Sequence, residues 1–238
     1  MRLHTETVGP TPPRLAFLHG LFGRGRNWAG IARSLATAPD WPGTAPPPGF
    51  GQRPLGSLLV DLPNHGDSGW TPRFSYLETA DIVAAELPEH AGKTLLVGHS
   101  MGGKVAMLVA QRHPQLLAGL VVIDIAPGLS GGVRNFDPVV EAVMEVDLKT
   151  VSTRADVDER LRERVPDPAV RALLLQNLKA TPNWHWQPNL DLLAQSLPAI
   201  EAWPAFAERP WNGPVLWIKG AESPYVKPEH LPTMRRLF

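Results

Sequence analysis

Five short runs of apolar residues, separated by helix-like segments, constrain the fold of this chain more than any other feature. The runs cover residues 14–19, 57–63, 93–100, 120–126 and 214–220. Each is almost continuously apolar, which is typical of parallel strands that helices cover on both faces. Helical patterns between them cover residues 28–36, 76–87 and 103–113. This alternation predicts βαβ units and a mostly parallel sheet in an α/β fold.

The stretch from residue 128 to residue 207 lacks the strand pattern. Helical patterns occupy it over residues 136–149, 154–165, 169–178 and 190–202. We expect these helices to form a lid over the carboxyl ends of the strands, where such sheets bind ligands. The predicted organisation is a core of residues 1–127 and 208–238 with a lid of residues 128–207. Residues 37–56 are rich in proline and glycine and are expected to form a surface loop.

The composition argues against several functional classes. The 238 residues contain 23 Lys and Arg against 23 Asp and Glu, so we expect neither a nucleic-acid nor an anionic-membrane surface. No run approaches the ~20 apolar residues of a membrane span. We therefore expect a soluble, cytoplasmic protein with a small-molecule partner. The absence of cysteine rules out disulfides, thiol catalysis and cysteine-bound metal.

The stretch Gly98-His99-Ser100-Met101-Gly102 contains the pattern G-x-S-x-G. It ends an apolar run and begins a helical pattern, so the chain must turn within a few residues with Ser100 at the tip. The flanking glycines leave room for such a turn. This arrangement predicts a nucleophile elbow in which Ser100 is the nucleophile.

A serine nucleophile also needs N–H donors for the oxyanion that forms on its substrate. The backbone N–H of Met101 lies at the start of the predicted helix. The stretch His19-Gly20-Leu21-Phe22-Gly23 follows the first apolar run, and a glycine-rich turn there presents a second main-chain N–H. We expect Leu21 and Met101 to supply the two donors.

Four motifs in this order, LHGLFG, DLPNHGDS, GHSMGGKVAM and VVIDIAP, resemble the α/β-hydrolase superfamily. More closely, the chain resembles the branch of small bacterial esterases related to the mitochondrial abhydrolase-domain proteins, from about Leu15 to the last residue. The resemblance implies an α/β-hydrolase fold and hydrolysis of short carboxylic esters or acyl-CoA thioesters through an acyl-enzyme. It implies neither a metal nor an organic cofactor.

Three acidic residues are candidates for the acid of a catalytic triad. Asp124 ends the apolar run after the elbow helix, and the relatives that the chain resembles use an aspartate there. Glu222 follows the next run, where many other α/β-hydrolases place the acid, and Asp191 lies in the lid. A carboxylate at a strand end can orient a histidine and stabilise its imidazolium, which favours Asp124.

The catalytic histidine is the missing member of the triad. The resemblance implies a further strand and a Gly-His-Trp type loop, but the chain ends at Phe238 before such a motif. None of the eight histidines lies in it: His4, His19, His65, His90, His99, His113, His185 and His230. His185 in the lid and His230 near the end are the candidate substitutes. We expect the last strand and helix to be absent and the chain to be a truncated hydrolase.

Two other interpretations remain open. A pseudo-hydrolase that binds an acyl ligand or a protein without turnover would also lack the histidine. A lyase of the same fold from the menaquinone pathway shares the HG-x-x-G and G-x-S-x-G features. Arginine is typical of the elbow helix in that lyase, whereas Lys104 stands here.

Two further expectations concern the pocket and the surface. Phe22, His99, Trp184 and Trp186 are predicted to line the substrate pocket. The run at residues 214–220 becomes an exposed apolar edge if no strand follows it in the sheet. Such edges favour pairing with another chain, so self-association is expected.

Overall fold

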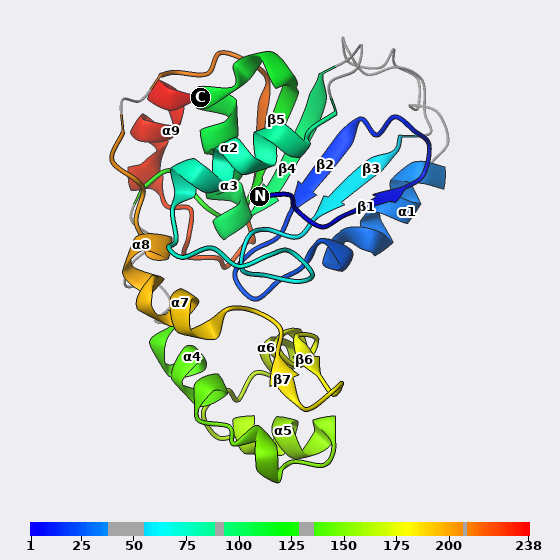
Figure 1. The fold of residues 1–238 in the computed structure, drawn as a ribbon. Coiled ribbons are helices and arrows are strands. Elements are labelled where there is room, and N and C mark those ends of the chain that lie inside the picture. Colours follow the sequence, from blue (N-terminus) through cyan, green and yellow to red (C-terminus); the bar gives the residue numbers. More distant parts are fainter. Residues whose placement is uncertain (38–54, 89–92, 129–135, 207–208) are drawn as a thin grey trace.

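The computed structural model describes residues 1–37, 55–88, 93–128, 136–206 and 209–238. Its centre is a six-stranded sheet with the order β1-β3-β2-β4-β5-β8 (Figure 1). The strands are β1 (Thr5–Val8), β2 (Leu15–Leu18), β3 (Ser57–Val60), β4 (Thr94–His99), β5 (Leu117–Ile123) and β8 (Val215–Ile218). β1 pairs antiparallel with β3, and the other neighbouring strands pair in parallel. The predicted mostly parallel α/β sheet is confirmed.

Helices cover both faces of this sheet. On one face, Leu15 and Phe17 of β2 pack with buried residues of α1 (Ala29–Thr37). On the other face, Ala16 and Leu18 belong to a larger core shared with α2 (Tyr76–Glu86) and α3 (Met101–Arg112). Every residue of β2 is therefore buried, which explains why its sequence is apolar without alternation.

Between β5 and β8, residues 136–206 form an inserted segment that lies below the carboxyl ends of the strands in Figure 1. Its helices are α4 (Asp137–Met144), α5 (Arg154–Leu161), α6 (Pro168–Leu175), α7 (Leu190–Gln195) and α8 (Leu197–Glu201). Buried residues such as Val140 of α4 and Leu193 of α7 belong to the same hydrophobic core as α2 and α3. The division into core and lid domains stays a prediction.

The structure corrects the expectation that the inserted segment is entirely helical. β6 (Leu178–Lys179) and β7 (His185–Trp186) form a two-stranded antiparallel sheet. Strands this short leave no periodic pattern in the sequence. The prediction of a single helix over residues 190–202 is also wrong, because α7 and α8 are separate helices. Pro198 has no N–H to donate to a carbonyl four residues earlier, so one continuous helix is interrupted there.

Two elements outside the inserted segment were not predicted. β1 is short and only partly buried, so its sequence carries no apolar run. α9 (Leu231–Leu237) follows β8 and buries Met234 and Leu237. Most of the predicted surface loop at residues 37–56, together with His90, lies outside the described residues.

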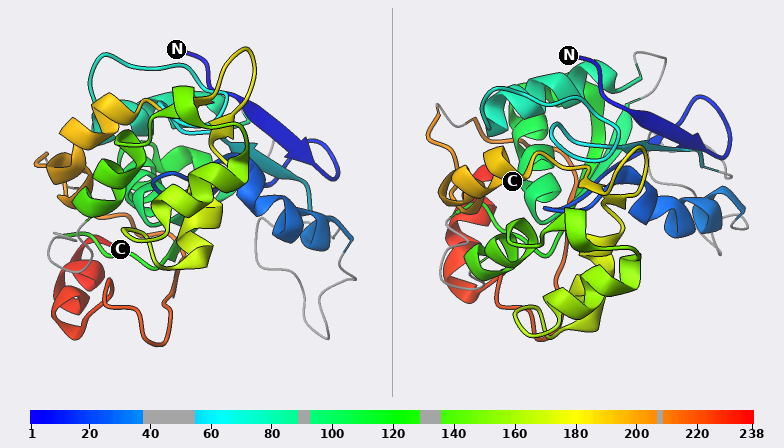
Figure 2. Two further views of the ribbon diagram at one scale, coloured as in Figure 1. Left: turned by 90° about the horizontal axis from the view of Figure 1, so that it is seen from below. Right: turned by 60° about the horizontal axis from the view of Figure 1, so that its bottom comes forward.

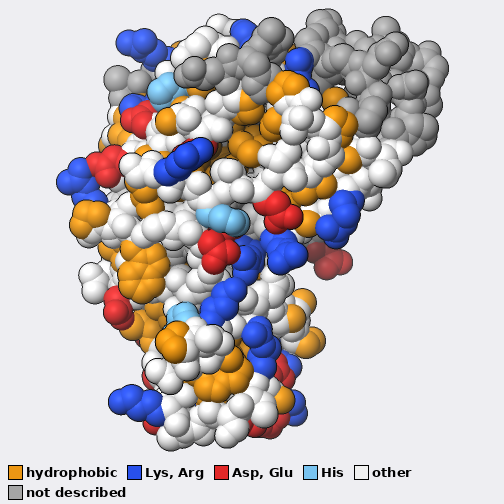
Figure 3. All heavy atoms as spheres, turned by 45° about the vertical axis from the view of Figure 1, so that its right-hand side comes forward, with side chains coloured by type: hydrophobic (Ala, Val, Ile, Leu, Met, Phe, Trp, Pro, Cys, Tyr) orange, Lys and Arg blue, Asp and Glu red, His pale blue; other side chains and the backbone are white. Residues whose placement is uncertain are grey.

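Acidic and basic side chains are interspersed on the surface. Figure 3 shows them side by side on one face. One such pair is Arg24 and Asp67, at 3.0 Å. Among the described residues, no helix combines the length and the hydrophobicity that crossing a membrane requires.

Candidate active site

Ser100 lies at the turn between β4 and α3. Its backbone has φ 52° and ψ −120°, a conformation that non-glycine residues rarely adopt. The Ser100 N–H donates to the carbonyl of Ile123 at 3.0 Å, and the Ser100 carbonyl accepts from Gly103 and Lys104. The turn is therefore fixed both to the end of β5 and to the first turn of α3.

The glycines on either side of Ser100 are required by close packing. A Cβ on Gly98 would lie 2.3 Å from the carbonyl oxygen of Gly102, and a Cβ on Gly102 would lie 2.4 Å from that of His19. Real Cβ atoms do not approach backbone oxygen so closely. The G-x-S-x-G pattern thus reflects how tightly β4, α3 and the end of β2 meet.

Of the three candidate acids, the structure places Asp124 at the same edge of the sheet as Ser100. Asp124 directly follows β5, its N–H donates to Ile218 at 2.8 Å, and its Oδ1 accepts from Gly220 at 3.2 Å. Glu222, in the loop after β8, and Asp191, in the first turn of α7, are both exposed. None of the three, Asp124 included, lines the cavities beside Ser100, so the position of Asp124 at the end of β5 is what distinguishes it.

The turn after β2 lies next to Ser100. Its Gly23 N–H donates to the Gly20 carbonyl at 2.9 Å. Within the described residues, the N–H groups of Leu21 and Met101 have no hydrogen-bond acceptor. Buried N–H groups are nearly always paired, so Leu21 and Met101 stay the predicted oxyanion donors.

An apolar cavity of about 300 Å³ opens beside Ser100. The turn after β2 forms one wall, and residues of α6 and the start of α4 form another. The lining residues are His19, Gly20, Leu21, Phe22, Gly23, Asn27, Trp28, His99, Ser100, Phe136, Val139, Val170, Leu173 and Leu174. The predicted pocket residues Phe22 and His99 are among them. Trp184 and Trp186 are not; they pack instead against the hydrophobic core.

A smaller cavity on the other side of Ser100 reaches Lys104, which is 1% exposed. Lys104 Nζ donates to the carbonyls of Ile200, Glu201 and Ala202 at 3.1, 2.7 and 2.9 Å. Burial lowers the pKa of Lys104 to about 7, and the charge of Glu201 acts in the opposite direction. The carbonyls at the end of α8 favour the ammonium form, so Lys104 anchors the inserted segment to the elbow helix.

One described group of side chains has metal-ligand atoms close together. The ligand atoms of His4, Asp61 and Asp67 lie within 4.8 Å of one another. The Asp61 carboxylate already accepts from the backbone N–H groups of Gly25 and Asp67 and from His4. Arg24 pairs with Asp67. These bonds give the cluster a structural role after β3.

The sequence from residue 13 to residue 238 matches the family model described as the alpha/beta hydrolase fold. The chain belongs to the α/β-hydrolase family. The sn-1-specific diacylglycerol lipase ABHD11 of Danio rerio is 35% identical to this hydrolase over 94% of this chain and 68% of its own length. Esterase YbfF of Escherichia coli is 29% identical over 91% of this chain and 77% of its own length.

Solved structures agree with this assignment. An esterase from a marine microorganism is 28% identical, covers 100% of this chain with 87% of its own, and gives a TM-score of 0.84. This α/β-hydrolase is a hydrolytic enzyme, as its similarity to proteins named lipase and esterase within the family shows.

In the described part of this α/β-hydrolase, no histidine ring is hydrogen-bonded to Ser100. His185 is exposed and bonds to the Asn183 carbonyl in its own hairpin, and His230 accepts from the Lys227 N–H. His99 lines the cavity, and burial lowers its pKa against the opposing charge of Asp124. The structure therefore brings neither candidate substitute, His185 or His230, to the nucleophile.

Sequence reasoning expected the inserted segment to line this cavity but named the wrong residues, Trp184 and Trp186. Val170, Leu173 and Leu174 of α6 reach it, as do Phe136 and Val139 beside α4. The only sequence signal is their helical spacing, and core residues show the same spacing. The pattern cannot tell a pocket wall from an ordinary buried face.

Proposed function

We propose that this α/β-hydrolase cleaves small carboxylic esters with an apolar acyl group and that Ser100 is its nucleophile. The main support is the position of Ser100, in a strained turn beside an apolar cavity of about 300 Å³. Strained backbone is concentrated at functional sites. The similarity to a lipase of Danio rerio and an esterase of Escherichia coli also supports ester hydrolysis.

The proposed reaction proceeds in two steps. Ser100 Oγ passes its proton to a base and forms a bond to the ester carbonyl carbon, and the N–H groups of Leu21 and Met101 stabilise the oxyanion. The bond to the leaving alcohol breaks as the carbonyl re-forms, and the alcohol takes the proton from the protonated base. Water then attacks the acyl-enzyme and releases the carboxylic acid. Asp124 is the proposed acid that stabilises the protonated base.

Fluorophosphonate labelling tests the nucleophile. With imidazole added as the base, we expect the probe to transfer one phosphonyl group to the protein with loss of fluoride, and Ser100→Ala to abolish this transfer with little change in thermal stability. Ser34→Ala, on the exposed surface of α1, is the matched control and should label like the unchanged protein. Labelling that persists in Ser100→Ala would contradict the assignment.

We expect proton removal from Ser100 to limit the rate of the reaction, because no described histidine is hydrogen-bonded to its hydroxyl. Loss of a triad member leaves about 10³–10⁴-fold catalysis over water. We expect low turnover of p-nitrophenyl butyrate by the 238-residue protein and an increase of at least ~10-fold with added imidazole as the base. Ser100→Ala at the same imidazole concentration corrects for hydrolysis in solution. An imidazole effect of equal size in Ser100→Ala would contradict the proposed site.

Thioesters are a second proposed substrate class. The same attack on a thioester breaks a carbon–sulfur bond and releases a thiol. The relative kcat/KM for p-nitrophenyl butyrate and butyryl-CoA measures the preference. If the protein binds these acyl compounds but does not hydrolyse them and does not react with the fluorophosphonate, it is a pseudo-hydrolase.

A further inference from the structure

The peptide unit between Phe22 and Gly23 is hydrogen-bonded at both ends. Its N–H donates to the Gly20 carbonyl at 2.9 Å. Its carbonyl accepts from Asn177 Nδ2 at 2.7 Å. Phe22 has a positive φ of 60°, which is unfavourable for a residue with a side chain. These two bonds therefore hold a strained turn in one conformation.

The Gly20 side of the turn is fixed by His19. His19 Nε2 accepts from the Leu62 N–H at 2.9 Å, so Nδ1 carries the proton and donates to the Gly20 carbonyl at 2.8 Å. Burial lowers the pKa of His19 to about 3, which keeps the ring neutral and this tautomer in place. The core thus supports one half of the turn.

The other half is supported from the inserted segment. Asn177 lies between α6 and β6, which Figure 2 shows beside the segment that leads from β2 to α1. Its side chain is buried, and its backbone is bonded to Leu174 and Gln187. Nδ2 also donates to the Leu173 carbonyl at 3.3 Å, and two carbonyl acceptors require the NH₂ end of the amide at this position.

The amide oxygen of Asn177 indicates that this side chain does more than fill space. Asn177 Oδ1 is buried and has no hydrogen-bond partner among the residues that the structure describes. An unsatisfied buried acceptor costs stability, whereas an apolar residue of similar size would avoid that cost. The donor to Phe22 is what the asparagine supplies and a leucine could not.

We propose that Asn177 is a positioning residue for the oxyanion loop, defined as residues 20–23. It fixes the Phe22 carbonyl, and so keeps the neighbouring Leu21 N–H directed at the substrate oxygen. This inference rests on the proposed function of Ser100 and adds that the inserted segment helps to build the oxyanion hole. Without Asn177 the Phe22–Gly23 peptide can rotate and release its turn bond.

The test compares Asn177→Leu and Asn177→Ala with the unchanged protein. Asn177→Leu keeps the branched shape and the number of side-chain heavy atoms and removes the unpaired oxygen, so the fold is expected to persist. Gln176→Ala is the matched control. The exposed side chain of Gln176 also accepts a hydrogen bond from outside the inserted segment, from Asn27 Nδ2, but it does not contact the oxyanion loop. Amide hydrogen exchange at Gly23, measured by NMR, reports directly on the turn.

In both Asn177 variants we expect Gly23 to exchange about tenfold faster relative to amides of β4, since one hydrogen bond is lost. With imidazole present, kcat for ester hydrolysis should fall about 10- to 100-fold with KM within twofold, less than the loss of a whole oxyanion donor. Gln176→Ala should change neither quantity.

Unchanged exchange at Gly23, or changes as large in Gln176→Ala, would overturn the proposal. A fall in kcat that is matched by an equal rise in KM would also overturn it, since that indicates a binding defect. If the unchanged protein shows no turnover with imidazole, the proposed function fails instead. Gly23 exchange then still decides whether Asn177 holds the loop.

Discussion

Ser100 and Asp124 share an unusual backbone conformation, with φ of 52° and 57°. Each N–H donates to the last carbonyl of the next strand, Ser100 to Ile123 at 3.0 Å and Asp124 to Ile218 at 2.8 Å. These bonds connect the ends of β4, β5 and β8. The two residues therefore leave the sheet at the same edge, although they are far apart in the sequence.

The role proposed for Asp124 predicts a specific kinetic effect. Asp124→Asn should lower the imidazole-dependent rate of ester hydrolysis by ~10-fold or more, because a carboxylate stabilises the imidazolium that forms. Glu222→Gln and Asp191→Asn, both at exposed positions, should leave that rate unchanged. If one of these controls lowers the rate and Asp124→Asn does not, the acid has been assigned to the wrong residue.

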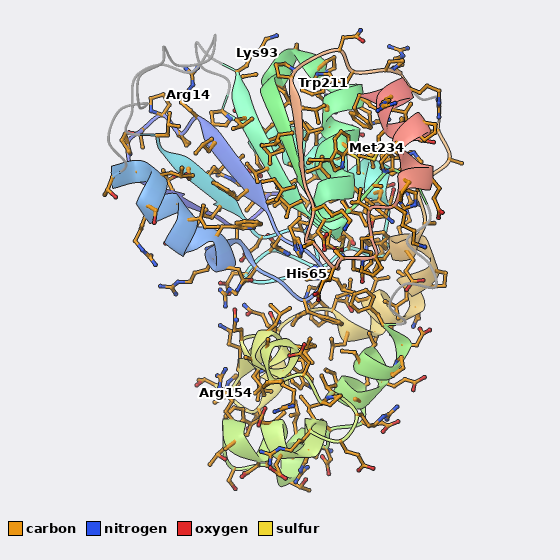
Figure 4. All side chains as sticks on the ribbon, turned by 180° about the vertical axis from the view of Figure 1, so that it is seen from behind. Arg14, His65, Lys93, Arg154, Trp211 and Met234 are labelled. Atoms are coloured by element: carbon orange, nitrogen blue, oxygen red, sulfur yellow. The ribbon has the colours of Figure 1, made fainter. Side chains whose placement is uncertain are left out.

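Two buried histidines predict how stability depends on pH. Burial lowers the pKa of His19 to about 3 and that of His65 to about 4, and Figure 4 shows His65 at the junction with the inserted segment. Below pH ~6.5 the unfolded chain binds protons that the folded protein does not, so the free energy of unfolding falls as pH decreases.

Between pH 7 and pH 5 the expected loss is roughly 2 kcal/mol per histidine, measured by urea unfolding. His65→Gln should reduce the difference between the two pH values. His185→Gln, at an exposed position, should retain it. Equal stability of the unchanged protein at both pH values would show that these rings are protonated in the folded state.

At the scale of elements, α3 meets the end of β2 without room for a side chain. A Cβ on Gly102 would lie 2.4 Å from the His19 carbonyl oxygen, whereas a Cβ on Gly30 in α1 meets nothing within 4 Å. The same substitution should therefore have opposite effects at these two helical positions.

Gly102→Ala should lower the free energy of unfolding by about 2 kcal/mol or more, because backbone atoms must move. Gly30→Ala should raise it by about 0.5 kcal/mol through its higher helix propensity. Thermal or urea unfolding measures both changes. A neutral Gly102→Ala would mean that β2 and α3 are not packed as described.

At the scale of the whole molecule, β8 forms one edge of the sheet. Leu216 and Ile218 on this strand are 55% and 46% exposed. Unpaired apolar edge strands favour pairing with another chain. We propose that two copies associate through β8.

Sedimentation velocity tests this association. The sedimentation coefficient should rise with concentration, and Leu216→Lys should weaken that dependence by placing a charge on the edge. Ile31→Lys is the matched control, because Ile31 is 50% exposed and lies on α1 instead of on β8. A monomer at all concentrations would contradict the proposal.

The sequence by itself determined the strands that are buried on both faces and the turn that carries Ser100. These features are local: a strand covered on both sides must be apolar at every position, as in Leu15–Leu18, and a tight turn needs small neighbours such as Gly98 and Gly102. Such requirements determine the types of consecutive residues. A reader of the sequence can therefore recover them without knowing what packs against what.

Only the tertiary structure decided which distant residues meet. It placed Asp124 at the same sheet edge as the elbow, left Ser100 without a hydrogen bond to any described histidine, and joined Asn177 to Phe22. Phe22 and Asn177 are 155 positions apart, and a single asparagine carries no periodic signal. Contacts of this kind depend on how whole elements pack, because each side chain gains its partner only after strands and helices are in place.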